Sequence, residues 1–286
     1  NIVPVYDLGE NEQGQIFYSM SQVNGTPWHK ALGGFENLEK NLEILGKVAD
    51  AVAFAHSKGV IHRDLKPENV MLGEFGEVVV MDWGLAASVQ QGAKAEAITK
   101  STAVSGTPAY LAPEMALGDP ERIGVPSDIY LLGGMLYEIV TGLKPHAGKS
   151  IMECLYNAAS NVIQDSPITG EIKDIALKAM AAEPADRYAS VLDFQKAIRA
   201  YKSHFESIAL ATTADENLQQ AGGSGDYNLY SQAVFGFQSA LKLWDGNERA
   251  QAGAGEATFA YAQCAFDKGD LDLAASQLDA LGEEAE

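Results

Sequence analysis

The spacing of apolar residues changes along this chain, and the changes predict its elements. Runs of β-forming residues at 2–8 and 15–20 flank a Gly-containing turn at 11–14, which predicts a β-hairpin. From Leu38 to Ala55 the apolar positions recur every three or four residues, which predicts a helix that ends at Gly59. Further helices are predicted near 127–141, 150–159, 171–182 and 190–204. A few strands followed by many helices indicate an α+β fold.

The last part of the chain has a different pattern. Small and aromatic residues recur at helical spacing there and predict helices over 230–241, 257–268 and 271–281. Charge changes as well, because residues 1–205 hold 17 basic and 25 acidic residues, whereas residues 206–286 hold 3 and 14. Small and polar residues around Gly223 predict a flexible linker at 206–226. We therefore expect a first domain at 1–205 and an all-α segment at 227–286.

The net charge restricts the partners that we expect, and the cysteine content indicates the cellular compartment. The formal net charge is -19, so we expect no nucleic acid partner and no membrane contact within this segment. Cys154 and Cys264 fit neither a disulfide framework nor a zinc site, which predicts a reducing, cytoplasmic location. A parent protein anchored in a membrane outside this segment is the alternative. Because the chain starts at Asn1 and not at Met, we expect it to be an interior piece of a longer protein.

Four motifs follow the long predicted helix in a fixed order. They are His62-Arg63-Asp64-Leu65-Lys66-Pro67-Glu68-Asn69, Asp82-Trp83-Gly84, Gly106-Thr107-Pro108 and Ala112-Pro113-Glu114. Alone, a motif such as Asp-x-Gly is usually a turn, but the ordered set is specific. Over roughly 1–205 the chain resembles the eukaryotic-like protein kinases, in particular the bacterial serine/threonine kinases. The resemblance implies a protein-kinase-like fold, with the last N-lobe strands and the hinge at 1–23 and a helical C-lobe at 24–205.

The resemblance implies transfer of the γ-phosphoryl group of Mg-ATP to Ser and Thr hydroxyls of proteins. Asp64 is the implied catalytic base, and Lys66 is the implied cation beside the γ-phosphate. Asn69 and Asp82 offer the hard oxygen ligands that Mg²⁺ (or Mn²⁺) prefers. Thr107 matches the residue that contacts the base and, together with Lys66, implies a Ser/Thr acceptor.

The predicted hairpin gains a role from the same resemblance. Met20 falls at the gatekeeper position, and Ser21, Gln22 and Val23 fall at the hinge, where backbone groups hold adenine. Without that context, an apolar strand end is ordinary core. The implied ATP-binding residues are Met20, Ser21, Gln22, Val23, Lys66, Asn69 and Asp82.

Arg63 stands beside the implied base and can pair with a phosphate on the segment that follows. Thr99, Ser101 and Thr102 are the candidate phosphorylation sites in that segment, and the alternative is that they are ordinary polar loop residues. His62 is expected to be a packed residue that braces the loop.

Three further residues are expected to have structural roles. Glu114 and Arg187 match the buried ion pair of the family, which ties the activation segment to the helical lobe. Asp128 matches the residue that holds the catalytic loop through backbone N–H groups, and it is alternatively an N-cap neighbour of Ser127.

The chain departs from the family pattern in two places. Trp83 stands where Phe is usual, and since both are large aromatic residues we expect an adjusted pocket with activity retained. The chain starts at what would be the fourth strand of the family, so its sequence does not include the Gly-rich loop and the strand lysine that orient ATP. We interpret the chain as a truncated copy of an active kinase, with a degenerate kinase as the alternative, and expect the 286-residue piece alone to be inactive.

The acidic end resembles a tetratricopeptide repeat (TPR). Ala262, Gly269, Ala274 and Leu278 fit that pattern, whereas Thr258 stands in place of its usual Trp. A TPR-like segment is expected to dock peptide or protein partners, preferably basic ones, and a helical spacer or autoinhibitory tail is the alternative. For the whole protein the alternatives to a kinase are a pseudokinase scaffold that binds proteins and a small-molecule phosphotransferase. The motifs around Thr107 disfavour the latter.

Overall fold

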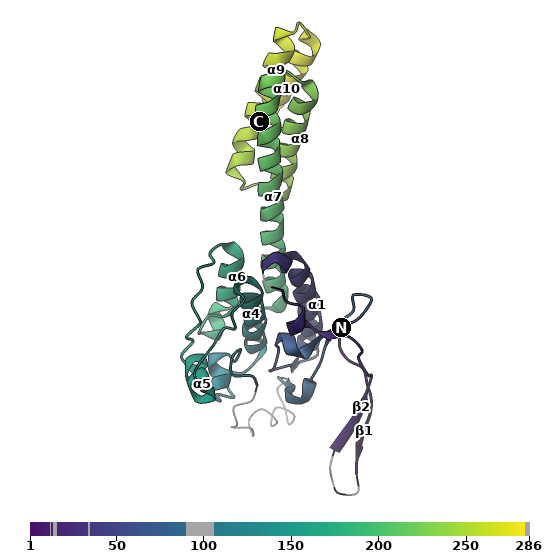
Figure 1. Cartoon of the computed structure of the whole chain (residues 1–286), viewed down its shortest axis with the longest axis vertical. Helices are drawn as coiled ribbons and strands as arrows, with labels where there is room; N and C mark the ends of the chain where they lie inside the picture. The colour runs from purple at the N-terminus through teal and green to yellow at the C-terminus, as the bar shows by residue number, and fades with distance from the viewer. Residues whose placement is uncertain (12, 14–15, 34, 90–105, 284–286) are drawn as a thin grey trace. The chain divides into compact units, whose positions relative to one another are not determined.

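A computed structural model describes residues 1–283, apart from residues 12, 14–15, 34 and 90–105 (Figure 1). Its contacts divide the chain into two compact units, Asn1–Ile198 (unit 1) and Arg199–Glu286 (unit 2). Unit 1 contains all the described strands together with most of the helices, whereas the described part of unit 2 is helical. The predicted α+β architecture is therefore confirmed.

The predicted hairpin is present near the start of unit 1. Strand β1 (Val5–Glu10) pairs antiparallel with β2 (Ile16–Met20), and the register shifts between Val5 and Asp7. Beyond the strands, the Ser21 N–H donates to the Pro4 carbonyl at 2.9 Å. The backbone pairing thus extends from the hairpin into the segment expected to be the hinge.

Two small antiparallel sheets hold the motif-bearing loops. One sheet has the order β3 (Thr26–Pro27), β5 (Val70–Leu72) and β6 (Val78–Val80), and the other pairs β4 (Val60–Ile61) with β7 (Ala87–Ser88). Residues 62–69 run from β4 to β5, and residues 81–86 run from β6 to β7. Both loops are therefore anchored at each end by a strand, one in each sheet.

Helix α4 (Val125–Thr141) is the most deeply buried helix of unit 1, and it packs against α1 (Leu38–Ser57) and α6 (Glu171–Ala179). A Cβ added to Gly133 would lie 2.6 Å from the Ala179 Cβ, so this glycine allows α4 and α6 to approach closely. Among the described residues, the other α-helices that lie in or begin in unit 1 are α3 (Pro113–Ala116), α5 (Ile151–Ala159) and α7 (Val191–Ser224). The short 3₁₀ helices are Trp28–Lys30, Phe35–Asn37, Pro67–Asn69, Trp83–Leu85 and Pro184–Asp186.

Unit 2 consists of the later part of α7 together with α8 (Tyr227–Leu243), α9 (Glu248–Asp267) and α10 (Leu271–Glu283). Its core contains mainly alanines from α7, α8 and α9, around the ring of Phe237. Asn247 caps α9 by accepting a hydrogen bond from the Ala250 N–H, and its Nδ2 donates to Ser207 Oγ at 2.9 Å. In turn, Ser207 donates to the Ala240 carbonyl at 2.8 Å, so neutral polar groups join α7, α8 and α9.

Two predictions about this region are wrong. The linker expected at 206–226 is helical through Ser224, because Ala211, Ala214 and Ala221 bury their side chains and keep the chain in α7. Helix α9 begins at Glu248 and not near Ala257. The TPR assignment of this segment stays a prediction. Within the described residues, none of the helices has the length and apolar character needed to cross a membrane.

Candidate active site

A buried carboxylate fixes the loop between β4 and β5. Asp128, at the start of α4, accepts hydrogen bonds from the backbone N–H groups of His62 at 2.8 Å and Arg63 at 2.9 Å. His56 Nε2 lies 2.8 Å from the same carboxylate. Arg63 has a φ of 71°, a backbone conformation that non-glycine residues rarely adopt. The charge-assisted bonds to Asp128 hold this loop conformation in place.

His62 connects this loop to the following motif. Its Nδ1 accepts a hydrogen bond from the Asp64 N–H at 3.2 Å, and its Nε2 lies 3.0 Å from the Met81 carbonyl. This pattern requires the proton on Nε2, because Nδ1 is the acceptor. The imidazole is fully buried and lies 4.6 Å from the Trp83 ring, centroid to centroid. Trp83 therefore packs against the buried histidine of the preceding loop motif.

Four predicted residues meet at the centre of the site. Lys66 Nζ donates to Asp64 Oδ2 at 2.8 Å and to Thr107 Oγ1 at 2.6 Å. The Thr107 hydroxyl donates to Asp64 Oδ1 at 2.9 Å, and Asn69 Nδ2 donates to Asp64 Oδ2 at 3.0 Å. We call Asp64, Lys66, Asn69 and Thr107 the Asp64 cluster. Each oxygen of the Asp64 carboxylate is thereby held in place, and Asp64 is only 8% exposed.

Gly106 allows Thr107 to reach this cluster. Its φ is 114°, and an added Cβ would lie 2.7 Å from the Leu111 side chain and 3.1 Å from the Arg63 carbonyl. A larger residue would therefore push the segment away from Asp64. In the sequence this glycine is evident only as part of the Gly106-Thr107-Pro108 motif, and a Gly directly before a polar site residue is the signal that points to such a close approach.

Asn69 and Asp82 offer oxygen ligands for a divalent cation. Asn69 uses its Nδ2 to donate to the Asp64 carbonyl and carboxylate, which leaves its Oδ1 for another partner. The Asn69 carbonyl accepts from the Met81 N–H at 2.8 Å, so the residue before Asp82 is tied to Asn69. Asp82 is exposed and has a φ of 56°. No group of three or more His, Cys, Asp or Glu side chains suited to a metal occurs in the described residues. These two oxygen donors fit a Mg²⁺ ion that takes its other ligands from phosphate and water.

The expected hinge residues line a separate hollow. Ser21, Gln22 and Val23 surround a space of about 240 Å³ together with Pro4 and Val79, among others. Met20, at the end of β2, is 44% exposed. The role of Met20, Ser21, Gln22 and Val23 in binding adenine stays a prediction.

Arg63 has a neutral partner in this structure. Its Nε donates to the Leu85 carbonyl at 2.5 Å. Burial lowers the pKa of the Arg63 guanidinium, and the nearby Asp128 carboxylate opposes this change. Thr99, Ser101 and Thr102, the expected phosphorylation sites, lie outside the described residues.

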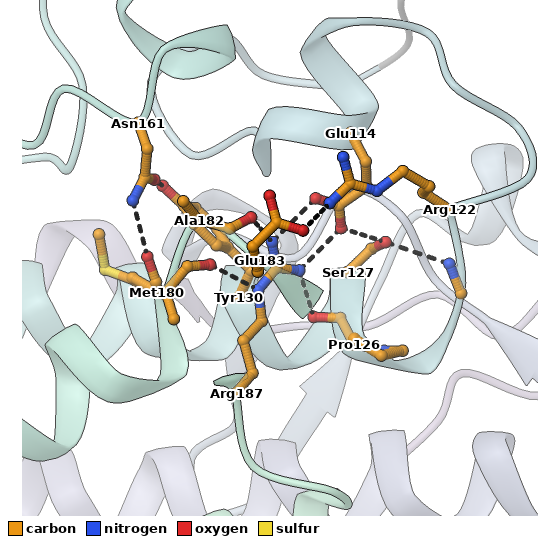
Figure 2. A network of polar contacts seen from close by, with 12 residues as sticks. Glu114, Arg122, Pro126, Ser127, Tyr130, Asn161, Met180, Ala182, Glu183 and Arg187 are labelled. Carbon is orange, nitrogen blue, oxygen red and sulfur yellow. Dashed lines mark hydrogen bonds and ion pairs between the residues drawn. The ribbon is translucent and has the colours of Figure 1, made fainter. Parts of the chain in front are cut away.

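A buried ion pair supports the segment that follows Thr107. The Arg187 guanidinium donates to both oxygens of Glu114, at 2.7 and 2.8 Å, and both side chains are fully buried (Figure 2). Ser127 Oγ donates to Glu114 at 2.7 Å, and Arg187 also donates to the Pro126 carbonyl at 2.9 Å. This network joins α3, the start of α4 and the segment after the 3₁₀ helix at Pro184–Asp186.

Sequence reasoning missed a second group of charged residues beside the loop. Lys144 Nζ lies 2.9 Å from Glu68 Oε1, and the Tyr110 hydroxyl donates to Glu138 at 2.5 Å. Burial raises the pKa of Tyr110 and of Glu138. Glu68 belongs to the quoted loop motif, but its partner is 76 residues away in sequence, and no local pattern links the two.

The sequence of this chain is similar to those of known proteins. The sequence profile of the family described as protein kinase domain matches residues 1–200. The serine/threonine-protein kinase PknD of Protochlamydia amoebophila is 33% identical over 254 residues, which cover 76% of this chain and 26% of PknD. The serine/threonine-protein kinase PknB of Mycobacterium leprae is 33% identical over 241 residues, which cover 80% of this chain and 38% of PknB.

A third relative has a similar match. The probable serine/threonine-protein kinase SCO3848 of Streptomyces coelicolor is 34% identical over 236 residues, which cover 79% of this chain and 34% of that protein. The chain thus spans between about a quarter and two fifths of the length of these relatives. With its match over 1–200 and these bacterial relatives, the chain belongs to the protein kinase domain family.

Proposed function

We propose that the polypeptide that carries this chain is a serine/threonine protein kinase, which transfers the γ-phosphoryl group of Mg-ATP to protein hydroxyl groups. The observation that carries the proposal is the Asp64 cluster, in which a carboxylate, an ammonium group, an amide and a hydroxyl are joined by direct hydrogen bonds. Phosphoryl transfer depends mainly on positioning and charge stabilisation, and such a cluster supplies both.

Asp64 accepts the proton of the attacking hydroxyl in this proposal. Its Oδ2 already accepts from Lys66 and Asn69, whereas Oδ1 accepts only from Thr107 among the described contacts. A carboxylate oxygen has two lone-pair sites, so Oδ1 keeps one of them for a substrate hydroxyl. Lys66 has three N–H donors and uses two of them within the cluster, which leaves one for a phosphate oxygen.

Asn69 Oδ1 and the Asp82 carboxylate would hold the Mg²⁺ of Mg-ATP, whose charge neutralises the phosphates when it is bound. Arg63 would exchange its bond to the Leu85 carbonyl for a phosphate on Thr99, Ser101 or Thr102, because a guanidinium binds a charged phosphate more strongly than a neutral carbonyl. Glu114 and Arg187 would keep the segment after Thr107 in place during turnover.

The choice of Ser and Thr over other acceptors is supported by similarity. PknD and PknB are named serine/threonine-protein kinases. Their match, together with the contact between Lys66 and Thr107, supports proteins with Ser or Thr as substrates. We place the reaction in the cytoplasm as part of the same proposal.

Unit 2 is proposed to dock partners. Residues 206–286 hold 3 basic and 14 acidic residues, and Arg249 is engaged by Asp215 and Glu256. Lys268 contacts the Gly225 carbonyl and the Tyr227 ring. Acidic side chains therefore dominate its free surface charge and favour a basic peptide or protein, in a salt-dependent manner. A scaffold without phosphotransfer, acting through this unit alone, is the second candidate function.

One experiment separates the two candidates. The polypeptide is expressed at its full genetic length, and Mg-ATP-dependent phosphate incorporation into a generic protein substrate is measured for the wild type and for Asp64→Asn. A general base contributes roughly 10²–10⁴ to the rate, so we expect a loss of that size in the variant. Asp174→Asn removes an exposed carboxylate on α6 and serves as the matched control with unchanged rate. Folded wild-type protein with no incorporation above Asp64→Asn would support the scaffold.

A further inference from the structure

A buried chain of hydrogen bonds in unit 1 shares no residue with the Asp64 cluster. His146 Nδ1 lies 2.8 Å from the Val162 carbonyl, and His146 Nε2 lies 2.8 Å from the Tyr130 hydroxyl. The same hydroxyl lies 2.7 Å from Asn161 Oδ1, and Asn161 Nδ2 lies 3.2 Å from the Met180 carbonyl. Figure 2 shows Asn161 reaching from Tyr130 to Met180. We call His146, Tyr130 and Asn161 the His146 chain.

The two ends of the His146 chain are backbone carbonyls, which accept hydrogen bonds and cannot donate. Four contacts at hydrogen-bond distance lie between them, so four protons are needed, one in each contact. Each of the three side chains makes two contacts within the chain. A neutral imidazole, a tyrosine hydroxyl or an amide can donate a hydrogen bond in only one of its two contacts. Together they supply three protons. The neutral chain is therefore one proton short, whichever tautomer or amide orientation is chosen.

In the neutral chain, any one of the four contacts can be the one without a proton. At one extreme, His146 donates to Val162, Tyr130 donates to His146, the Asn161 amide donates to Tyr130, and an amide oxygen faces the Met180 carbonyl. At the other extreme, Asn161 donates to Met180, Tyr130 donates to Asn161, His146 donates to Tyr130, and an unprotonated Nδ1 faces the Val162 carbonyl. An imidazolium donates from both ring nitrogens, so its additional proton completes all four contacts.

The groups around His146 include some that disfavour protonation of its ring and others that favour it. Tyr130 is the titratable neighbour on α4, the Arg187 guanidinium lies 4.9 Å from the Tyr130 ring centroid, and Glu114 on α3 neutralises Arg187. Burial lowers the pKa of His146, and hydrogen bonds to the backbone of Val162 and Leu111 act in the opposite direction. Burial thus favours the neutral ring, which takes up its proton as the pH falls.

We infer that His146 is a proton-binding site of the folded protein, at which uptake of one proton closes the His146 chain and its release opens one of the four contacts. The site is connected to the proposed acceptor region, because the His146 backbone N–H donates to the Ala109 carbonyl at 3.0 Å, two residues after Thr107. The chain would thus make the packing between α4, the segment at 161–162 and the end of α6 sensitive to pH.

The test is a titration of His146 in the whole chain. The protein contains five histidines, so ¹⁵N-labelled histidine gives few resonances, and His146→Phe identifies the one of interest. In Tyr130→Phe the hydroxyl is lost, so the second ring proton of His146 loses the acceptor that Tyr130 provides in the chain. In Asn161→Gly, Tyr130 is free to donate to the neutral ring, so no proton is missing. Glycine readily adopts the φ of 51° found at Asn161, and this variant carries the test if Tyr130→Phe fails to fold.

We expect each variant to reduce the proton affinity of His146 at least about tenfold, which is one pKa unit. Tyr137→Phe is the matched control, because it removes another buried hydroxyl from α4, one that donates to the Gln164 carbonyl outside the His146 chain. Its His146 titration should equal that of the wild type. Unchanged titration in Tyr130→Phe and Asn161→Gly, or a wild-type ring that stays neutral until acid unfolding, would overturn the inference.

Discussion

The two units of this protein bury different kinds of side chain. Among the described residues, unit 1 buries ionisable groups, including His62, Asp64, Glu114, Asp128, His146 and Arg187. The polar residues buried in unit 2 are neutral, namely Ser207, Asn247 and Thr258, and most of its buried apolar residues are alanines. The two units therefore differ in the type of side chain that their cores bury.

Burying a charge costs free energy unless hydrogen bonds or an opposite charge compensate for it. In unit 1 the compensated charges lie where they hold a loop or a segment in position. Asp128 holds the loop that carries Asp64, and Arg187 holds the segment after Thr107. Unit 2 relies on close approach of helices, as shown by Gly236, where an added Cβ would lie 2.9 Å from the Ala214 Cβ. Unit 1 should therefore be sensitive to the loss of a charged partner, and unit 2 to added volume.

The largest expected effect is the loss of Arg187. Arg187→Ala leaves the Glu114 carboxylate buried with Ser127 as its remaining side-chain donor among the described contacts. Breaking a buried pair in this way costs about 3–5 kcal/mol of unfolding free energy. Hydrogen exchange of the amides in α4, followed by mass spectrometry, measures this change within unit 1.

Arg122→Ala is the matched control for this prediction. Arg122 pairs with Glu183 at 2.6 Å, but both side chains are substantially exposed. Exposed pairs contribute about 0.2–1 kcal/mol, so the control should barely alter exchange in α4. Equal effects of the two arginine substitutions would remove the distinction between paired buried charge and surface charge.

A smaller effect is expected from added volume in unit 2. An added Cβ at Gly253 of α9 would lie 2.4 Å from the Phe237 ring, so Gly253→Ala should destabilise unit 2 by about 1–3 kcal/mol. At Gly255, in the same helix, nothing lies within 4 Å of the added Cβ. Gly255→Ala should therefore stabilise the helix by about 0.5–1 kcal/mol. Exchange of α9 amides reports both values, and the same sign for both variants would contradict the packing argument.

Features that depend on residues close together in the chain could be predicted from the sequence. The hairpin, the helix from Leu38 and the loop motif around Asp64 were all readable, because their residues are neighbours in the chain or recur at a helical period. The meeting of Asp64 with Thr107 was available only through family resemblance, since the two are 43 residues apart.

Features that depend on distant contacts were missed or misread. Gly222 and Gly223 favour a linker locally, but burial of the Ala221 side chain keeps this stretch within α7. Gly253 lies before the helix expected at 257–268, whereas in the structure it belongs to α9 and makes room for Phe237. The His146 chain brings together a helix, two loops and the residue after α6, and no pattern in the sequence signals that contact.

The central claim is that the Asp64 cluster acts as one catalytic unit, and a double-mutant cycle tests it most directly. Phosphate transfer by the full-length polypeptide is measured for Asp64→Asn, for Thr107→Ala and for the double variant. Groups that act together have non-additive effects, so Thr107→Ala should slow the wild type but scarcely slow protein that already carries Asp64→Asn. An equal fold loss from Thr107→Ala in both backgrounds would show that Thr107 acts independently of Asp64 and would contradict the account.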